Sequence, residues 1–198
     1  ATPHSVPATE FEPPPVEMTE GFFYFLGRWV ACGSFSKEDV VISCGYHDAD
    51  ETLGFLVRQQ LKDKEGDVVS FRSRELPDTV QIILGNSALR RWIERNFGRL
   101  SKFKALPIWM LGIQKSWRKA FLDGYVDGDG SRFKEEGHSE RVETGSASRR
   151  LSLGIKLMAT SLGFACSWHH TIQGDSEIDG RVIKGGDYYR VVWRVNCQ

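Results

Sequence analysis

The residues best suited to do chemistry are an aspartate and a cysteine that end two similar stretches of the chain. One stretch is LDGYVDGDG, residues 122–130, and the other is FLGRWVACG, residues 25–33. Asp129 and Cys32 occupy the same place in the two stretches, directly before a glycine. A carboxylate at the end of a helix, together with main-chain oxygens of the last turn, suits a hard cation such as Mg²⁺. The alternative is a solvated aspartate in an ordinary Asp-Gly turn.

Both stretches carry small residues at helical spacing. Gly27 and Ala31 lie four residues apart in the first stretch, as do Gly124 and Gly128 in the second. Positions four apart share one face of a helix, and small side chains there allow two helices to approach closely. We therefore predict a pair of packed helices that places residues 32 and 129 together at one end of the helix interface.

The hydrophobic pattern predicts the same order of elements twice along the chain. Helices are expected over residues 21–31, from Asp48 to Leu61, from Asn86 or Ser87 to Phe97, over 117–129, and from Ser146 or Ser148 to Leu162. Strands are expected over residues 40–44, 68–72, 79–84, 131–143, 164–172 and 188–195, with a turn-rich stretch over 174–186. The repeat indicates a mixed α/β fold with pseudo-twofold symmetry. We expect a proline-rich arm or linker (residues 1–18), a first half (19–100) and a second half (101–198).

The charge distribution permits a nucleic-acid partner, although the total charge does not reveal one. The chain has 26 basic and 26 acidic residues and is 40% hydrophobic. Glu10, Glu12, Glu17 and Glu20 lie in a segment without lysine or arginine, so the remaining chain carries 26 basic against 22 acidic residues. A basic surface can therefore coexist with a neutral total. No apolar run resembles a membrane span and no targeting segment is recognised, so a cytoplasmic or nucleoid-associated protein is expected.

The second stretch resembles the LAGLIDADG motif of homing endonucleases, and the first resembles the degenerate first motif of intein endonucleases. Other segments follow in the order typical of that family: the KALP block at residues 104–107, the helix-like residues 148–163 and the closing strand at 188–193. The chain is thus similar to a two-motif, DOD-type LAGLIDADG endonuclease domain of an intein, over about residues 19–196.

The resemblance implies two αββαββα halves whose antiparallel, saddle-shaped sheets bind double-stranded DNA. The acids at the motif ends would bind Mg²⁺, for which Mn²⁺ can substitute, and hydrolyse one phosphodiester on each strand. Asp129 carries over as a catalytic metal ligand, with Gly33 and Gly130 as the neighbouring motif ends. Lys104 matches a basic residue that stabilises charge near the cleaved phosphate, or it is a surface lysine before a proline turn. A monomer, embedded in or excised from an intein splicing domain, is expected.

Cys32 departs from the family, which has Asp or Glu at this position. A thiol is neutral near pH 7 and is a poor ligand for Mg²⁺. Glu38 and Asp39 would have to fold back to replace the missing acid. The open alternatives are a nuclease that is weakened or limited to nicking, a catalytically inactive DNA-binding protein of maturase-like or repressor-like use, and an introduced substitution. Outside the family, a soluble α/β protein whose Asp-rich turn binds a metal without DNA remains a rival.

Polar residues of the predicted strands and their loops are the candidates for DNA contacts. Arginine can bind guanine with two hydrogen bonds, and any of these residues can instead contact phosphate. Because side chains alternate along a strand, we expect about half of them to face DNA. The candidates are Lys37, Arg72, Arg74, Gln81, Arg132, Lys134, Arg181, Lys184, Arg190 and Arg194.

Overall fold

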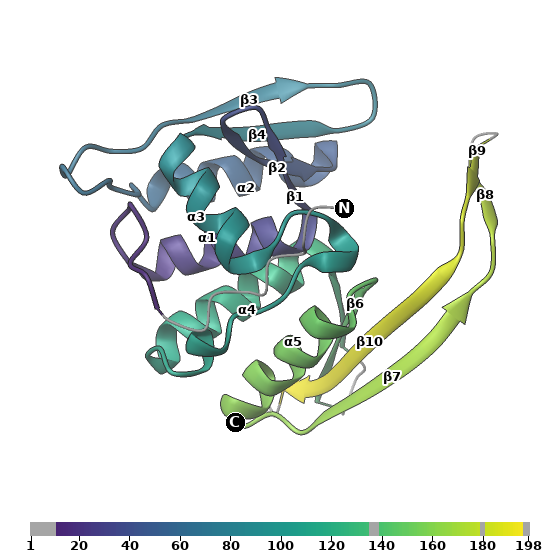
Figure 1. Ribbon diagram of the computed structural model, residues 1–198. Coiled ribbons are helices and arrows are strands. Elements are labelled where there is room, and N and C mark those ends of the chain that lie inside the picture. Colours follow the sequence, from purple (N-terminus) through teal and green to yellow (C-terminus); the bar gives the residue numbers. More distant parts are fainter. Residues whose placement is uncertain (1–10, 135–138, 179–180, 196–198) are drawn as a thin grey trace.

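Both halves of the chain begin with a helix, two strands and a second helix, followed by further strands (Figure 1). Among the described residues only the first half ends in a third helix, so the αββαββα order that the resemblance implied is complete only there. The computed structural model describes residues 11–134, 139–178 and 181–195. The first half consists of α1 (Glu20–Cys32), β1 (Gly33–Ser36), β2 (Asp39–Cys44), α2 (Tyr46–Arg58), β3 (Phe71–Glu75), β4 (Val80–Gly85) and α3 (Ser87–Phe97). Two short 3-10 turns follow, η1 (Ser101–Phe103) and η2 (Ile108–Leu111). The second half consists of α4 (Lys115–Asp129), β5 (Gly130–Phe133), β6 (Glu140–Ser146), α5 (Arg149–Ser161), β7 (Cys166–Gln173), β8 (Ser176–Ile178), β9 (Arg181–Ile183) and β10 (Gly186–Val195).

Each half contains a four-stranded antiparallel sheet with an equivalent strand order. The orders are β1-β2-β4-β3 in the first sheet and β5-β6-β10-β7 in the second. Strands β7 and β10 extend beyond the helices as an arm, and β8 and β9 form a hairpin at its tip (Figure 1). The repeated order confirms the predicted mixed α/β fold with internal duplication.

Side-chain caps fix the starts of three helices. The Thr19 hydroxyl accepts a hydrogen bond from the Phe22 amide, the Asn86 side chain from the Leu89 amide, and the Ser148 hydroxyl from the Leu151 amide. Such caps satisfy amide groups that have no partner inside the helix. Of the predicted alternatives, Asn86 and Ser148 are therefore the caps.

Several local predictions differ from the structure. Asp48 lies inside α2, which begins at Tyr46 without a side-chain cap. Strand β1 was not predicted, and β3 begins at Phe71 rather than Val68. The stretch predicted as turns over 174–186 contains β8, β9 and the start of β10. These strands lie at sheet edges or on the projecting arm. A strand in such a place can consist largely of polar residues, so its sequence lacks the alternating apolar pattern by which strands are predicted.

The helices cover one face of each sheet, and the core lies between them and the sheets. In β2 and β4, Val40 pairs with Leu84 and Ile42 pairs with Ile82, and all four side chains are buried. The opposite face of each sheet, called the outer face below, is turned away from the helices (Figure 1). None of the described helices has the length and apolar character needed to span a membrane.

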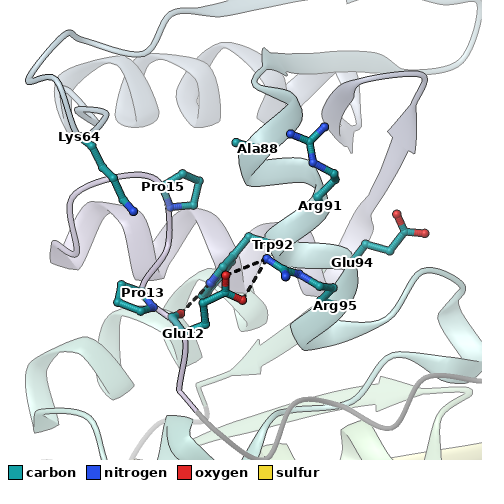
Figure 2. Close-up of a pocket in the computed structure, with 9 residues that line it drawn as sticks. All are labelled: Glu12, Pro13, Pro15, Lys64, Ala88, Arg91, Trp92, Glu94 and Arg95. Carbon is teal, nitrogen blue, oxygen red and sulfur yellow. Dashed lines mark hydrogen bonds and ion pairs between the residues drawn. The ribbon is translucent and has the colours of Figure 1, made fainter.

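Residues 11–18, predicted as part of an arm or linker, lie against the first half. Val16 is buried, and the Glu17 amide donates to the carbonyl oxygen of Lys62. Figure 2 shows Trp92 and Arg95 of α3 bonded to Glu12, and the Trp92 indole donates to the Glu12 carbonyl at 2.8 Å. A pocket of about 570 Å³ lies between this segment and α3, and none of its lining residues belongs to α1 or α4. The domain boundary at residue 18 stays a prediction.

Candidate nucleic-acid interface and active site

Helices α1 and α4 touch through the small residues of the two motifs. A Cβ atom on Gly27 would overlap the carbonyl oxygen of Phe121, and one on Gly124 would overlap that of Tyr24. A Cβ atom on Gly128 would lie 2.5 Å from the Cβ atom of Ala31. Real Cβ atoms do not approach this closely, so the two backbones meet directly at these positions. The residues predicted at the helix interface therefore all lie between α1 and α4.

This close packing brings the C-terminal ends of the two helices together, where Cys32 and Asp129 lie. A Cβ atom on Gly128 would lie 3.6 Å from Cys32 Sγ, which places the thiol against the last turn of α4. Cys32 Sγ also donates to the carbonyl oxygen of Arg28, at 3.3 Å. Two contacts therefore hold the Cys32 thiol. One is its hydrogen bond to Arg28 within α1, and the other is the packing of α1 against α4, which also positions Asp129.

Lys104 lies in the segment between the two halves, and its side chain binds the C-terminal end of α1. Its buried Nζ donates to the carbonyl oxygens of Trp29 at 3.0 Å, Val30 at 2.9 Å and Gly33 at 2.9 Å. An ammonium group at the negative end of a helix is electrostatically favourable. These three bonds use the three hydrogens of the ammonium group. In this conformation Lys104 is not a surface lysine, and its charge acts beside the motif ends without a free donor for a phosphate.

Burial shifts the titration of the three groups at the motif ends. It raises the pKa of the Asp129 carboxyl to about 6, with Lys104 acting in the opposite direction. It raises the pKa of the Cys32 thiol to about 11, although Arg28 lowers it. Burial also lowers the pKa of Lys104 to about 8, against the attraction of its neighbours. Near pH 7 the site therefore contains one carboxylate, one neutral thiol and one ammonium group.

A small cavity of about 60 Å³ connects Lys104 to Asp129. Its polar lining also includes Ser101, Ser146 and Tyr125. A polar cavity of this size has room for one or two water molecules. The Tyr125 hydroxyl donates to the carbonyl oxygen of Gly145 at 3.1 Å, which joins α4 to β6 on this side of the site.

The described residues do not provide the paired acidic metal site that the sequence resemblance implies. Cys32 offers a neutral sulfur, which is a poor Mg²⁺ ligand, and the carbonyl oxygen of Gly33 is bound by Lys104. Asp39 is paired with Arg72 at 2.8 Å, and Glu38 lies 3.9 Å from Arg91, so neither acid replaces the missing one. Within the described ranges, no group of three His, Cys, Asp or Glu side chains is placed to hold a metal ion.

The predicted DNA contacts of the first half gather on the outer face of its sheet. Arg72 and Arg74 of β3 lie opposite Ile83 and Gln81 of β4, between the positions that face the core. Arg74 donates to the side-chain oxygen of Gln81 at 3.0 Å. Lys37 is exposed at the turn between β1 and β2, with a φ of 52°.

The predicted contacts of the second half divide between two faces. Arg190 and Arg194 are exposed on the outer face, and Lys134 is exposed just after β5. Arg132 does not lie with them, because it is 3.4 Å from Asp127 of α4 and therefore faces the helices. Successive side chains along β5 point to opposite faces of the sheet, and that of Arg132 points away from the outer face. Two more candidates belong to the arm: Lys184 is exposed and bonded to Asp175, and the side chain of Arg181 lies outside the described residues.

Tyr188 is a neighbour of the site that the sequence did not indicate. Its ring occupies the space above Gly145, where a Cβ atom would overlap it. Burial raises the pKa of the Tyr188 hydroxyl, and the nearby charges of Asp129 and Glu143 raise it further. A tyrosine in a strand carries no spacing signal, so only the fold reveals that it lies near Asp129 on the outer face.

Comparison with known proteins agrees with this geometry. Residues 116–192 match the family model described as a LAGLIDADG-like domain. The homing endonuclease I-DmoI in complex with DNA and Ca superimposes with a TM-score of 0.51 and 14% identity, covering 89% of this chain and 83% of that chain. An I-DmoI variant in complex with its target DNA and Mn gives a TM-score of 0.51 and 13% identity, with 89% and 87% covered. No curated protein matches the chain in sequence.

The fold is therefore the LAGLIDADG fold, with two four-stranded antiparallel sheets arranged as in I-DmoI. The part of the chain that matches the LAGLIDADG-like domain model, residues 116–192, contains the stretch that ends at Asp129.

Asp129→Asn is expected to stabilise the fold at neutral pH. The folded-state pKa of about 6 lies above the ordinary aspartate pKa of 3.8, so the folded chain binds more protons than the unfolded chain between these values. Stability conferred by this group is therefore lost as the pH rises from about 4 to 6. Burial of the Asp129 carboxyl is only partial, and the residue keeps solvent contact that screens its charge, so we expect a gain of only about 1 kcal/mol at pH 7. Urea unfolding of both proteins at pH 4.5 and 7 measures it, and identical pH dependence of the two would refute it.

Proposed function

We propose that this chain is a site-specific DNA-binding domain of the LAGLIDADG endonuclease type, in which Cys32 has disabled double-strand cleavage. The observation that carries the proposal is the composition of the motif ends. Asp129 is the carboxylate at the end of α4, and the equivalent position of α1 holds a half-buried thiol whose pKa is about 11. One half therefore retains its motif acid and the other half lacks it.

Duplex DNA is the partner that the outer faces favour. Arg72, Arg74, Arg190 and Arg194 project from two equivalent sheets, and their charge suits a polyanion. The two halves supply the twofold symmetry within one chain, so a monomer can engage both strands without a second copy. I-DmoI, whose structures include complexes with its target DNA, has the same fold.

A second candidate function is nicking of a single strand, and the retained acid favours it. Asp129 would supply the one carboxylate for Mg²⁺ or Mn²⁺, while Lys104 places a positive charge beside it. We further propose, from the order of its motifs, that the chain belongs to an intein.

Duplex binding is expected to weaken steeply as salt rises. Contacts to six or more phosphates predict a loss of roughly a thousandfold in affinity between 50 and 200 mM salt. Fluorescence anisotropy on labelled duplexes enriched from a randomised library measures this dependence. The Asp129→Asn variant serves as the control, because it should lose any nicking and keep most of its affinity. Absence of binding to every duplex at low salt would rule out the DNA-binding function and favour a metal-binding α/β protein.

A further inference from the structure

Two arginines on the outer faces are each held by a carboxylate of the same sheet. Arg72 Nη2 lies 2.8 Å from Asp39 Oδ2 in the first sheet, and Arg190 Nη1 lies 3.0 Å from Glu143 Oε1 in the second. The two carboxylates are about one-quarter exposed, at 25% and 23%, whereas the arginines are 65% and 44% exposed. Each sheet therefore presents an arginine with a fixed acidic neighbour.

The strand register builds the Arg72–Asp39 pair. Arg72 lies opposite Ile83 of β4, and Asp39 lies opposite Gly85 of the same strand. The Arg72 side chain therefore crosses β4 to reach β2. Gly85 leaves this path open, since a Cβ atom there would already lie 3.4 Å from Asp39 Oδ1. The pair thus lies across β4 on the outer face, at the end of the sheet where β2 begins and β4 ends.

Neither folding stability nor simple attraction to DNA accounts for these acids. Exposed ion pairs contribute little to stability because solvent screens them. A carboxylate on a surface that binds a polyanion also lowers the affinity, because it repels the phosphates. An acid at this position therefore needs a role in which its charge or its acceptor oxygens are useful.

Base recognition supplies such a role. Arginine donates two hydrogen bonds to the O6 and N7 atoms of guanine, and a carboxylate accepts one from the amino group of cytosine. An arginine and a carboxylate held side by side therefore match the two edges of one G·C base pair. If the arginine turned toward the backbone instead, its acid would remain near a phosphate and oppose that contact.

We propose that Asp39 and Glu143 are specificity-determining residues, which orient Arg72 and Arg190 toward G·C base pairs and disfavour phosphate contacts. The inference rests on the proposed DNA-binding function, and it assigns one G·C pair to each half of the target. Arg72 and Arg190 supply the donors, and the acids supply both their orientation and an acceptor.

The test is selection from a randomised duplex library by the native chain and by Asp39→Asn, Arg72→Ala and the double variant. The native chain should prefer guanine at one position of one half-site by roughly five-fold to a hundred-fold. Asp39→Asn and Arg72→Ala should each reduce this preference at that same position, and the double variant should lose no more than Arg72→Ala. Asp39→Asn should also bind unrelated duplexes more tightly, with a salt slope steeper by about one unit.

Glu94→Gln is the matched control. Glu94 lies 3.0 Å from Arg90 on α3, in the helix layer rather than on the outer face, so its loss should leave base preference unchanged. Glu143→Gln should change a different position, in the other half-site.

The outcomes separate the inference from the function on which it rests. If the native chain enriches no duplex, the proposed function fails and this assignment fails with it. If it enriches a site that Asp39→Asn and Glu143→Gln both select with unchanged base preferences, the assignment is overturned while the DNA-binding function stands.

Discussion

Gly124→Ala is expected to lower the free energy of unfolding by about 3 kcal/mol or more. The added Cβ atom would overlap the carbonyl oxygen of Tyr24 on α1, and a backbone atom cannot move aside as a flexible side chain can. The helices would have to separate, which would disturb Gly27 and its equally close approach to Phe121. Urea unfolding followed by circular dichroism measures the loss.

Gly54→Ala is the control for this prediction. Gly54 also lies inside a helix, α2, but a Cβ atom there would meet only the end of the Arg58 side chain, at 3.2 Å. Alanine should therefore stabilise the chain by up to about 1 kcal/mol through its higher helix propensity. If Gly124→Ala also stabilised the chain, that result would contradict the direct backbone contact between α1 and α4.

Cys32→Asp is expected to make the stability of the chain depend on divalent cations. Without metal, a second carboxylate beside Asp129 adds repulsion at the negative ends of two helices and should cost about 1–2 kcal/mol. Bound Mg²⁺ would remove that cost, because hard oxygen ligands replace the thiol. At a hundredfold excess over its dissociation constant, a bound ion adds about 2.7 kcal/mol of stability. Thermal unfolding with EDTA and with increasing Mg²⁺ measures both effects.

Cys32→Asn separates the effect of charge from that of size. This variant has a side chain of similar shape to aspartate without its negative charge, so it should show little response to Mg²⁺. The native chain should also respond weakly, because its site has one carboxylate and a neutral thiol. Equal responses from the native chain and Cys32→Asp would contradict the assignment of position 32 to the metal site.

The helix pair could be predicted from the sequence because it depends on local spacing. The small residues Gly27 and Gly124 predict a close approach of two helices. Asn86 is of a residue type that often caps helices, and it caps α3. Such signals lie within a few residues of one another. The duplication follows from the repetition of these local patterns.

Other features depend on contacts between distant segments, which a single sequence does not contain. The bond between Arg72 and Asp39 depends on the register of three strands. Arg132 is of a residue type that commonly contacts DNA, yet its position in the alternation of β5 points its side chain toward Asp127. The role of Lys104 beside a phosphate stays a prediction, whereas its bonds to the carbonyl oxygens of Trp29 and Val30 join segments far apart in the sequence.

Cleavage of a supercoiled plasmid that carries the selected duplex tests the central claim most directly. With Mg²⁺ or Mn²⁺, the native chain should bind the plasmid and give at most nicked circles. Cys32→Asp should give linear DNA, and Asp129→Asn should give neither product. Linear product from the native chain, at a rate equal to that of Cys32→Asp, would show that Cys32 does not disable double-strand cleavage.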